Sequence, residues 1–390
     1  EFSDINLNGS FSNISKRLDV QSFSTKLKEH FIKGDFSING FHNPLISTNL
    51  TGNISLDKIA FFISSPATKL VGNSTFDVQL KAQKMDENYR IKDLNGDVSI
   101  LNGKASFTTK QIDIDFDELH FTLSNTDMKI RGNRFKYQTD LFDFNTNIPN
   151  WIDVFLEKSQ TITIGGKMNF DMFTTSIWSD FFNKFDASED TTSFVEVQIN
   201  KLKLDVNTLH FNKALFHDVE IQHLELKEQI DLHYVKAKGQ GGDYYFENIK
   251  INNLDDGYSI LTKGELNRIS VDKLLYEFDD FEQTYINSNQ IKGEISSAFK
   301  ASFFINPSKS FDLKSLTFNS DNSFQHVKLI DYNYIAEIVD YFDESMITRN
   351  IVDIPYYKQK SKKIIFNPFR NNMSFKDGKL NISPTYLENN

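Results

Sequence analysis

The sequence predicts an all-β fold with a few short helices. Roughly twenty runs of alternating apolar and polar residues stand against four or five short helical stripes, a ratio typical of all-β proteins. Phenylalanine is unusually frequent, at 37 of 390 residues, yet the mean hydropathy is negative at -0.43. Large apolar side chains are therefore interleaved with polar ones, as on strands that have one apolar face and one polar face.

The first strands are expected between Leu7 and Lys84, where short alternating runs dominate. The clearest is FDVQLKAQ, residues 76–83, in which every second residue is apolar. The segment Leu18–His30 fits either a strand or a helix. Further alternating runs continue from Leu94 to Tyr137, so the strand pattern fills the first third of the chain.

Three glycine-containing sites predict tight turns. Asn102-Gly103 and Asp377-Gly378 each separate two alternating runs, and both residues of such a dipeptide tolerate positive φ, as a two-residue hairpin requires. In KGQGGDYYF, the glycines Gly239, Gly241 and Gly242 also favour a hairpin turn, because their spacing does not match a dinucleotide-binding loop.

Helices are expected where apolar residues recur at spacings of three and four. The third of the four predicted helices begins after Ser270. The Ser270 hydroxyl is expected to cap this helix by accepting a hydrogen bond from a backbone N–H of the first turn. The segments with this spacing are Trp151–Lys158, Thr174–Phe185, Val271–Phe278 and Ile335–Phe342.

The strand pattern resumes from Val195 to Leu254 with two single-residue slips in phase. One slip separates Ile199 from Leu202, and another separates Ile221 from Leu224. Because a one-residue slip reverses the two faces of a strand, bulges or turns are expected at both places. The polar segment 187–193 before this region is the best linker candidate.

Three architectures could cover the apolar faces of so many strands. Two sheets could pack as a sandwich, one sheet could close into a barrel, or one long sheet could bend into a trough around an apolar ligand. Four short helices are too few to cover twenty faces. Periodicity alone leaves the three architectures open.

Composition excludes several function classes. The net charge of -10 and the pI near 5.4 disfavour nucleic acid as a partner, because phosphates require a basic surface. The absence of cysteine excludes disulfides and thiolate catalysis. No apolar run approaches the length of a membrane-spanning helix. The chain opens in mid-pattern at EFSDINLNG, without a signal peptide, and is expected to be a segment of a longer protein.

No motif predicts an enzyme or a cofactor. Asp113, Asp115 and Asp117 resemble the start of a calcium loop, but the later glycine and glutamate are missing, so they are interpreted as the polar side of a strand. The histidines lack the short paired spacing of zinc motifs. No nucleophile elbow or catalytic triad is found. The densest histidine cluster comprises His210, His217, His223 and His233.

Several segments resemble AsmA-like proteins of Gram-negative envelopes. They are NRISVDKLLYEFDDFEQTYINSNQIKGEIS, HVKLIDYNYIAEIVDYF and NNMSFKDGKLNISPTYLENN, and FSINGFHNPLISTNLTGNISLDKIAFF is similar to the strand repeats of the same family. The resemblance is firmest over Gly264–Asn390. It implies an elongated, mostly antiparallel sheet curved into a taco-like groove, with residues 1–186 forming the first half and residues 194–390 the second, which resembles the AsmA-like C-terminal region.

The resemblance also implies a location and a role. AsmA-like proteins are periplasmic, are attached to the inner membrane by an N-terminal helix that this chain lacks, and are implicated in outer-membrane maintenance through lipid movement. The partner expected for this chain is a phospholipid or another acyl lipid. Since burying a methylene contributes about 0.8 kcal/mol, a sixteen-carbon tail costs on the order of 12 kcal/mol to carry bare through water.

The sequence therefore predicts a non-enzymatic segment that shelters acyl chains in an apolar β-groove. The residues expected to line the groove are Phe76, Val78, Leu80, Val195, Val197, Ile199, Phe299, Phe303 and Ile305. A lysine run could contact anionic headgroups, although a solvated loop is the favoured interpretation. The run comprises Lys358, Lys360, Lys362 and Lys363. The alternative function is a structural or adhesive β-sandwich array without a lipid groove.

Overall fold

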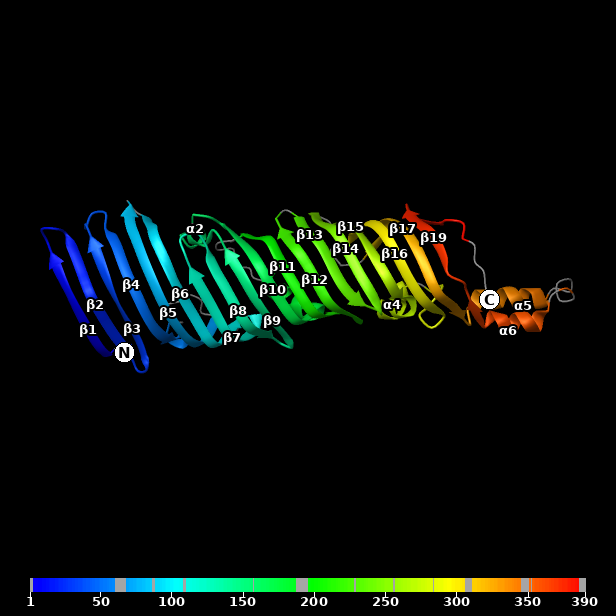
Figure 1. The fold of residues 1–390 in the computed structure, drawn as a ribbon, viewed down its shortest axis with the longest axis horizontal. Coiled ribbons are helices and arrows are strands. Elements are labelled where there is room, and N and C mark those ends of the chain that lie inside the picture. Colours follow the sequence, from blue (N-terminus) through cyan, green and yellow to red (C-terminus); the bar gives the residue numbers. More distant parts are fainter. Residues whose placement is uncertain are drawn as a thin grey trace. The chain divides into compact units, whose positions relative to one another are not determined.

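The computed structural model shows a mostly β protein with few short helices, as the sequence predicts (Figure 1). Its twenty described strands belong to one open sheet, most of whose strand pairs are antiparallel. The structure describes residues 3–59, 68–85, 88–107, 110–156, 158–186, 196–227, 229–254, 257–282, 284–305, 311–344, 351 and 353–385. The predicted linker, residues 187–193, lies outside the described residues.

The chain divides into two compact units. Unit 1 comprises Glu1–Phe173 and Ile177–Leu202, and unit 2 comprises Thr174–Ser176 and Lys203–Asn390. In unit 1 the strands are β1 (Ser3–Ser12), β2 (Arg17–Leu27), β3 (His30–Asn39), β4 (Leu45–Ser55), β5 (Thr68–Met85), β6 (Asn88–Phe107), β7 (Ile112–Leu123), β8 (Met128–Tyr137), β9 (Asp140–Ile148) and β10 (Thr161–Thr174). Strand β11 (Glu196–Phe211) runs through the boundary between the units.

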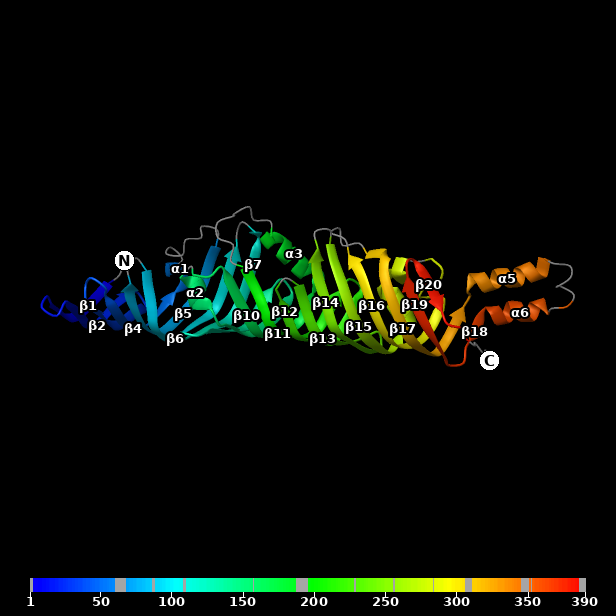
Figure 2. The same ribbon diagram turned by 90° about the horizontal axis from the view of Figure 1, so that it is seen from above.

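Unit 2 continues with β12 (Ala214–Leu226), β13 (Gln229–Gly239), β14 (Gly242–Leu254), β15 (Gly257–Ser270), β16 (Ile291–Ile305), β17 (Phe311–Ile330), β18 (Lys363–Ile365), β19 (Phe369–Lys376) and β20 (Lys379–Ile382). The described helices are α1 (Leu56–Ile59), α2 (Trp151–Phe155), α3 (Thr175–Asp186), α4 (Val271–Glu277), the 3-10 helix η3 (Asp279–Glu282), α5 (Asn333–Glu344) and α6 (Ile354–Ser361). Helices α5 and α6 lie side by side beyond β17 and β18 (Figure 2).

The four helices expected from apolar spacing are confirmed as α2, α3, α4 and α5. The prediction that the Ser270 hydroxyl caps α4 is wrong. Ser270 occupies the N-cap position, but its hydroxyl donates to the Asp272 carboxylate at 2.7 Å and caps no backbone N–H. Helix α6 lies where a loop was expected. Its N-cap is Asp353, whose carboxylate accepts from the Tyr356 N–H at 3.2 Å.

Strands β10 and β11 run in the same direction, unlike their antiparallel neighbours. The Glu196 N–H donates to the Gln160 carbonyl at 2.6 Å, and the Thr175 hydroxyl donates to the His210 carbonyl at 3.1 Å. Residue numbers on β10 and β11 therefore rise together, as in a parallel pair. A parallel pair needs a crossover connection, and α3 is part of it.

Cross-strand register in unit 1 separates apolar and polar residues onto opposite faces. Residues directly opposite in an antiparallel pair project from the same face. One such row runs over β4–β9 through Leu50, Val78, Gly96, Leu123, Met128 and Ile148, and the next runs through Gly52, Phe76, Val98, Phe121, Ile130 and Thr146. The reverse face carries Thr51, Asp77, Asp97, Thr122, Lys129 and Asn147.

Bulges keep the apolar residues on one face along each strand. Lys201 and His223 have positive φ, which confirms a conformational break at both predicted phase slips. At Arg134 and Arg268 the register also shifts, and the backbone N–H released from the ladder finds a side chain on the next strand. The Arg134 N–H donates to the Asp143 carboxylate at 2.6 Å, and the Arg268 N–H donates to the Ser296 hydroxyl at 3.0 Å.

Two of the three predicted turns are confirmed. Asp377-Gly378 joins β19 to β20, and Gln240-Gly241 joins β13 to β14, with positive φ at all four residues. The hairpin predicted at Asn102-Gly103 is wrong. Both residues lie inside β6, where Asn102 has a φ of 51° beside a register shift in the pairing with β5. The same left-handed conformation therefore makes a bulge here, because β6 continues to pair with both neighbours.

Several strand glycines lie directly opposite phenylalanines. Gly52 is paired with Phe76, and Gly132 is paired with Phe144. A methyl group added at Gly52 would come within 2.8 Å of the Phe76 ring, and one added at Gly132 would collide with the Phe144 ring. The rings thus lie over the glycines and shield the backbone, which explains in part why phenylalanine and glycine recur together in the strands.

We expect Gly132→Ala to destabilise the protein by about 1–3 kcal/mol, because the overlying ring must move out of a well-packed position. The measurement is chemical denaturation followed by circular dichroism. Asn133→Ala is the matched control, since Asn133 is adjacent in β8 but projects from the other face. An unchanged unfolding midpoint for Gly132→Ala would show that the packing of the Phe144 ring does not require a glycine at position 132.

Candidate functional site

The candidate site is the part-exposed apolar surface of the sheet in unit 1, which we call the open apolar face. Its residues share one face by cross-strand register, and each is partly accessible to solvent. Within the described part of this unit, no second sheet packs on it. The face comprises Phe36, Ile38, Ile46, Leu50, Phe76, Val78, Leu80, Val98, Ile100, Phe121, Ile130 and Phe144.

Helix α3 covers one part of this surface. Trp178 is buried, and its ring contacts Tyr137, Phe142 and Phe170, with centroid separations of 5.5–5.8 Å. The Trp178 indole N–H donates to the fully buried carboxylate of Asp140 at 2.9 Å. This hydrogen bond fixes the ring over β8–β10. The helix therefore builds a local core over these strands.

In unit 2, α4 plays a comparable role. Leu275 is buried, and the β15 residue Ile269, which leads into the helix, has no exposed surface. Gln240, in the turn between β13 and β14, accepts from the Tyr244 hydroxyl and donates to Glu277 of α4. Burial raises the pKa of Tyr244, the nearby Glu277 carboxylate adding to the effect. Tyr244 and Gln240 together link the β13–β14 turn to α4.

Beyond α4 the apolar side chains of β16 are again partly exposed. Phe299, Phe303 and Ile305 alternate along the strand, so they share one face. Phe303 lies opposite Ile260 of β15. Phe299 lies opposite Gly264, with its ring 5.9 Å from that of Phe246.

The structure brings most of the predicted groove residues onto part-exposed apolar surfaces. Phe76, Val78 and Leu80 lie together on the open apolar face, as expected. Val197 and Ile199 lie on β11, and Val197 is 48 % exposed. Val195 lies outside the described residues.

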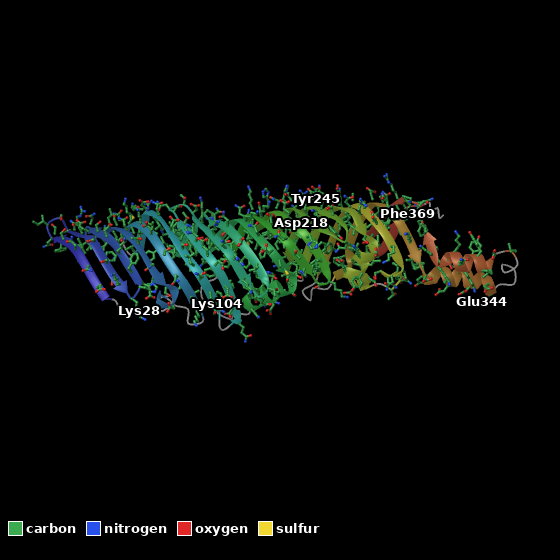
Figure 3. The ribbon with its side chains drawn as sticks, turned by 60° about the horizontal axis from the view of Figure 1, so that its bottom comes forward. Lys28, Lys104, Asp218, Tyr245, Glu344 and Phe369 are labelled. Carbon is green, nitrogen blue, oxygen red and sulfur yellow. The ribbon has the colours of Figure 1, made fainter. Side chains whose placement is uncertain are left out.

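The reverse face of the sheet is polar and internally paired. In unit 2, the Lys238 ammonium contacts the Asp218 carboxylate at 2.8 Å. Figure 3 labels Asp218 among the side chains of the unit 2 strands. Glu220 accepts from the Gln222 amide at 2.7 Å, the Lys203 ammonium at 3.1 Å and the Tyr234 hydroxyl at 3.1 Å. These donors, with Gln222 foremost, lower the pKa of the Glu220 carboxyl to about 2.

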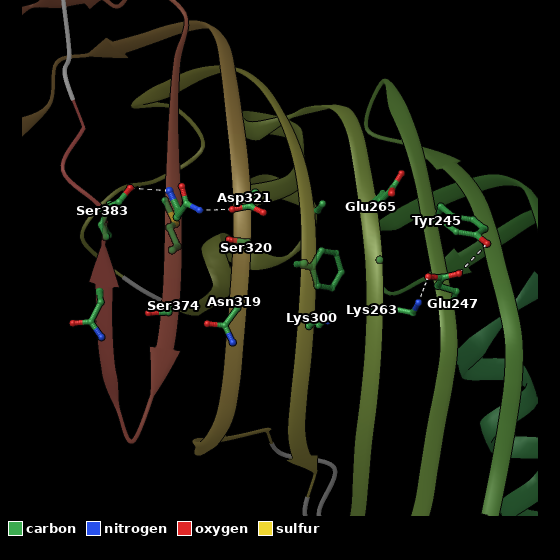
Figure 4. A pocket seen from close by; sticks show the side chains of 17 residues that line it. Tyr245, Glu247, Lys263, Glu265, Lys300, Asn319, Ser320, Asp321, Ser374 and Ser383 are labelled. Carbon is green, nitrogen blue, oxygen red and sulfur yellow. Dashed lines mark hydrogen bonds and ion pairs between the residues drawn. The ribbon is translucent and has the colours of Figure 1, made fainter.

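A hollow of about 620 Å³ lies on the polar face of unit 2 (Figure 4). Ala298 forms part of it, and charged residues from several strands surround it, including Glu265, Lys300 and Asp321. Lys263 is paired with Glu247 inside the hollow. The site offers hydrogen-bonding groups of both charges from several strands.

The predicted lysine contacts divide into two groups. Lys358 forms ion pairs with Asp340 at 3.0 Å and Asp343 at 2.8 Å, both on α5, and these pairs raise the pKa of its ammonium. Lys360, Lys362 and Lys363 make no ion pair with another described residue. The run is thus not a continuous free patch, because Lys358 joins the two helices.

The other candidate ligands remain separate. Asp113, Asp115 and Asp117 project from the exposed face of β7, and a hydrogen bond from Ser106 and then one from Lys104 lower the pKa of Asp113. Among the described residues, no three side chains of metal-binding type gather in one place. None of the described helices has the length and apolar character needed to cross a membrane.

Sequence reasoning missed the Trp178–Asp140 pair. The apolar stripe of α3 indicated a helix that packs on something, but it did not identify Asp140, which lies 38 residues earlier. An aspartate in the tight connection between two strands is ordinarily interpreted as a turn residue. Only the pairing of β8 with β9 places it beneath the helix.

Comparison of the chain with family models, with curated proteins and with solved structures finds no match. The resemblance to AsmA-like proteins therefore remains a prediction from the sequence.

We expect Glu220→Gln to reduce the loss of folding stability that occurs when the pH is lowered. A carboxyl whose pKa is depressed on folding contributes stability that is present above its unfolded pKa, near 4.5, and is lost as the pH falls toward 2. Thermal unfolding at about pH 6 and about pH 3 should show a larger loss for the wild type than for the variant. Equal losses in both proteins would contradict the proposed role of the three donors.

Proposed function

We propose that this chain is a non-enzymatic lipid-binding segment that shelters acyl chains on its open apolar face and on the part-exposed apolar side of β16. One observation carries the proposal, namely the apolar surface that continues in register from β3 to β9 and has part-exposed side chains on each of these strands. Exposed apolar patches larger than a few hundred Å² are unusual on soluble proteins and mark binding surfaces.

The chemistry of this face suits a hydrocarbon. Strand backbone donors and acceptors are consumed by the ladders on both sides, so the surface presents few groups that could bind a sugar or a peptide. The side chains at its centre, such as Leu50, Val78 and Val98, carry no polar atom. Each methylene of an acyl chain that leaves water for such a surface contributes about 0.8 kcal/mol.

The lipid expected on this face is a phospholipid or another acyl lipid, with its headgroup in water. The resemblance to AsmA-like proteins extends the proposal to a segment of a periplasmic protein that is attached to the inner membrane and conducts lipid for outer-membrane assembly or maintenance. The open apolar face supports lipid binding directly, while the location and the role in lipid movement depend on the resemblance.

The alternative, an adhesive β-sandwich array, has less support. A sandwich needs two sheets whose apolar faces pack about 10 Å apart. The described strands belong to one sheet, and the described helices, among them α3 and α4, cover only part of its apolar side. An adhesive role would leave the remaining apolar residues without an explanation.

We expect Leu80→Asp and Phe303→Asp to reduce bound lipid several-fold, because a carboxylate placed against an acyl chain would lose its hydration. The measurement is organic extraction of the purified protein followed by mass spectrometry, with delipidated protein reloaded from phospholipid as a second readout. Both variants must first show the circular dichroism spectrum of the wild type.

Gln79→Asp and Ser302→Asp are the matched controls, since each is adjacent in sequence to the test position but projects from the opposite face. They should retain wild-type lipid content. A folded Leu80→Asp/Phe303→Asp protein that carries as much lipid as the wild type would overturn the proposal. So would a wild-type protein that takes up no lipid.

A further inference from the structure

Helices α5 and α6 form a hairpin that is joined to the sheet of unit 2 at its base (Figures 1 and 2). The Asp331 N–H, just before α5, donates to the Lys362 carbonyl, just after α6, at 2.9 Å. Ile330 and Lys363 continue this contact as paired residues of β17 and β18. With the Lys358 ion pairs farther along, these contacts hold the helices together as one projecting element.

The hairpin exposes an apolar stripe that an ordinary amphipathic helix would bury. Tyr334, Ile338 and Tyr341 recur at spacings of four and three on α5, and they are 46 %, 54 % and 71 % exposed. Val339 lies on another side of the helix and is buried. Helix α5 therefore has one side packed within the protein and a second apolar side that faces solvent.

Tyrosine is concentrated in this element. Five of the 14 tyrosines of the chain fall between residues 332 and 357. On α6, Tyr356 and Tyr357 are each half exposed, and Lys360 lies 5.9 Å from the Tyr356 ring centre. Tyrosine is enriched where proteins meet the lipid–water boundary, because its ring is apolar and its hydroxyl remains hydrated.

The positive charge in and after α6 also favours contact with a lipid surface. Lys360, Lys362 and Lys363 have no acidic partner among the described residues, and lysines beside an apolar stripe can extend their ammonium groups toward phosphate. The α5 side is acidic, with exposed Glu337 and Glu344. Attraction to anionic lipid is therefore expected to be modest, and the apolar stripe is expected to supply most of the affinity.

We propose that the α5–α6 hairpin docks on the surface of a lipid bilayer, with its exposed tyrosines and Ile338 at the level of the headgroups. Such a contact is interfacial and does not span the membrane. It goes beyond acyl-chain binding, and its link to lipid transfer rests on that proposed function, since docking would bring one end of the unit 2 sheet close to a lipid source or acceptor.

The test measures binding of the full chain to vesicles of phosphatidylcholine, with and without phosphatidylglycerol, by flotation. The variant Ile338→Ser/Tyr341→Ser should bind about tenfold more weakly or worse, because it removes two exposed apolar anchors. Phe155→Ser/Tyr276→Ser is the matched control, since these residues are equally exposed but lie on α2 and α4. The control should bind as the wild type does.

A second variant separates charge from hydrophobicity. Lys360→Glu/Lys363→Glu should weaken binding to vesicles that contain phosphatidylglycerol and leave binding to phosphatidylcholine nearly unchanged. Wild-type vesicle binding by the Ile338→Ser/Tyr341→Ser protein would overturn the proposal. It would also be overturned if this variant changed only self-association in sedimentation, which would assign the stripe to a second copy of the chain.

The outcome is distinguishable from that of the acyl-binding test. Leu80→Asp/Phe303→Asp should keep vesicle binding while losing extracted lipid, and the hairpin variant should do the reverse. Loss of both properties in either variant would contradict the assignment of two separate surfaces.

Discussion

The sheet is one layer thick, and it has one polar face that is hydrated and one apolar face that must be covered. The rest of the structure depends on this difference between the two faces. The ladders satisfy the backbone of every interior strand, so the chemistry of each face depends on side chains alone. In unit 1 one face carries Asp77, Asp97 and Lys129, which remain hydrated. The other carries rows of leucine, valine and phenylalanine. Exposure of these side chains to water is unfavourable unless something covers them.

The protein supplies only part of that cover. Trp178 anchors α3 through Asp140, and Leu275 of α4 and Ile269 of β15 are both buried, so a core forms near each helix. The strands between β3 and β7 receive no equivalent helix of comparable size in the described chain. Their apolar side chains stay partly exposed, and an acyl ligand is the occupant whose chemistry matches them.

Local devices maintain the asymmetry over many strands. At a bulge such as that at Arg134, one extra residue restores the apolar phase that a plain alternation would have reversed. The glycine–phenylalanine pairs, such as Gly132 with Phe144, place rings over the backbone of the glycine. Both devices appear in the sequence as irregularities, and both keep the same face apolar.

Much of this fold could be predicted from the sequence, because strand alternation and helical spacing are local signals. Phe76, Val78 and Leu80 share a face for that reason. The Asn102-Gly103 dipeptide was misinterpreted as a hairpin because a left-handed residue serves a turn or a bulge equally well, and pairing with β5 and β7 decides between them. Helix α6 was missed because its stability comes from the Asp353 cap and from ion pairs with α5, which apolar spacing does not reveal.

Whether the apolar face contacts acyl chains can be measured directly with a phospholipid that carries a photoreactive group in its acyl tail. After irradiation, cross-linked residues are located by mass spectrometry of the digested protein. The account predicts adducts concentrated on residues such as Val78, Leu80 and Val98 and absent from their neighbours Gln79 and Ser99. Adducts spread equally over both faces, or confined to the polar face, would contradict it.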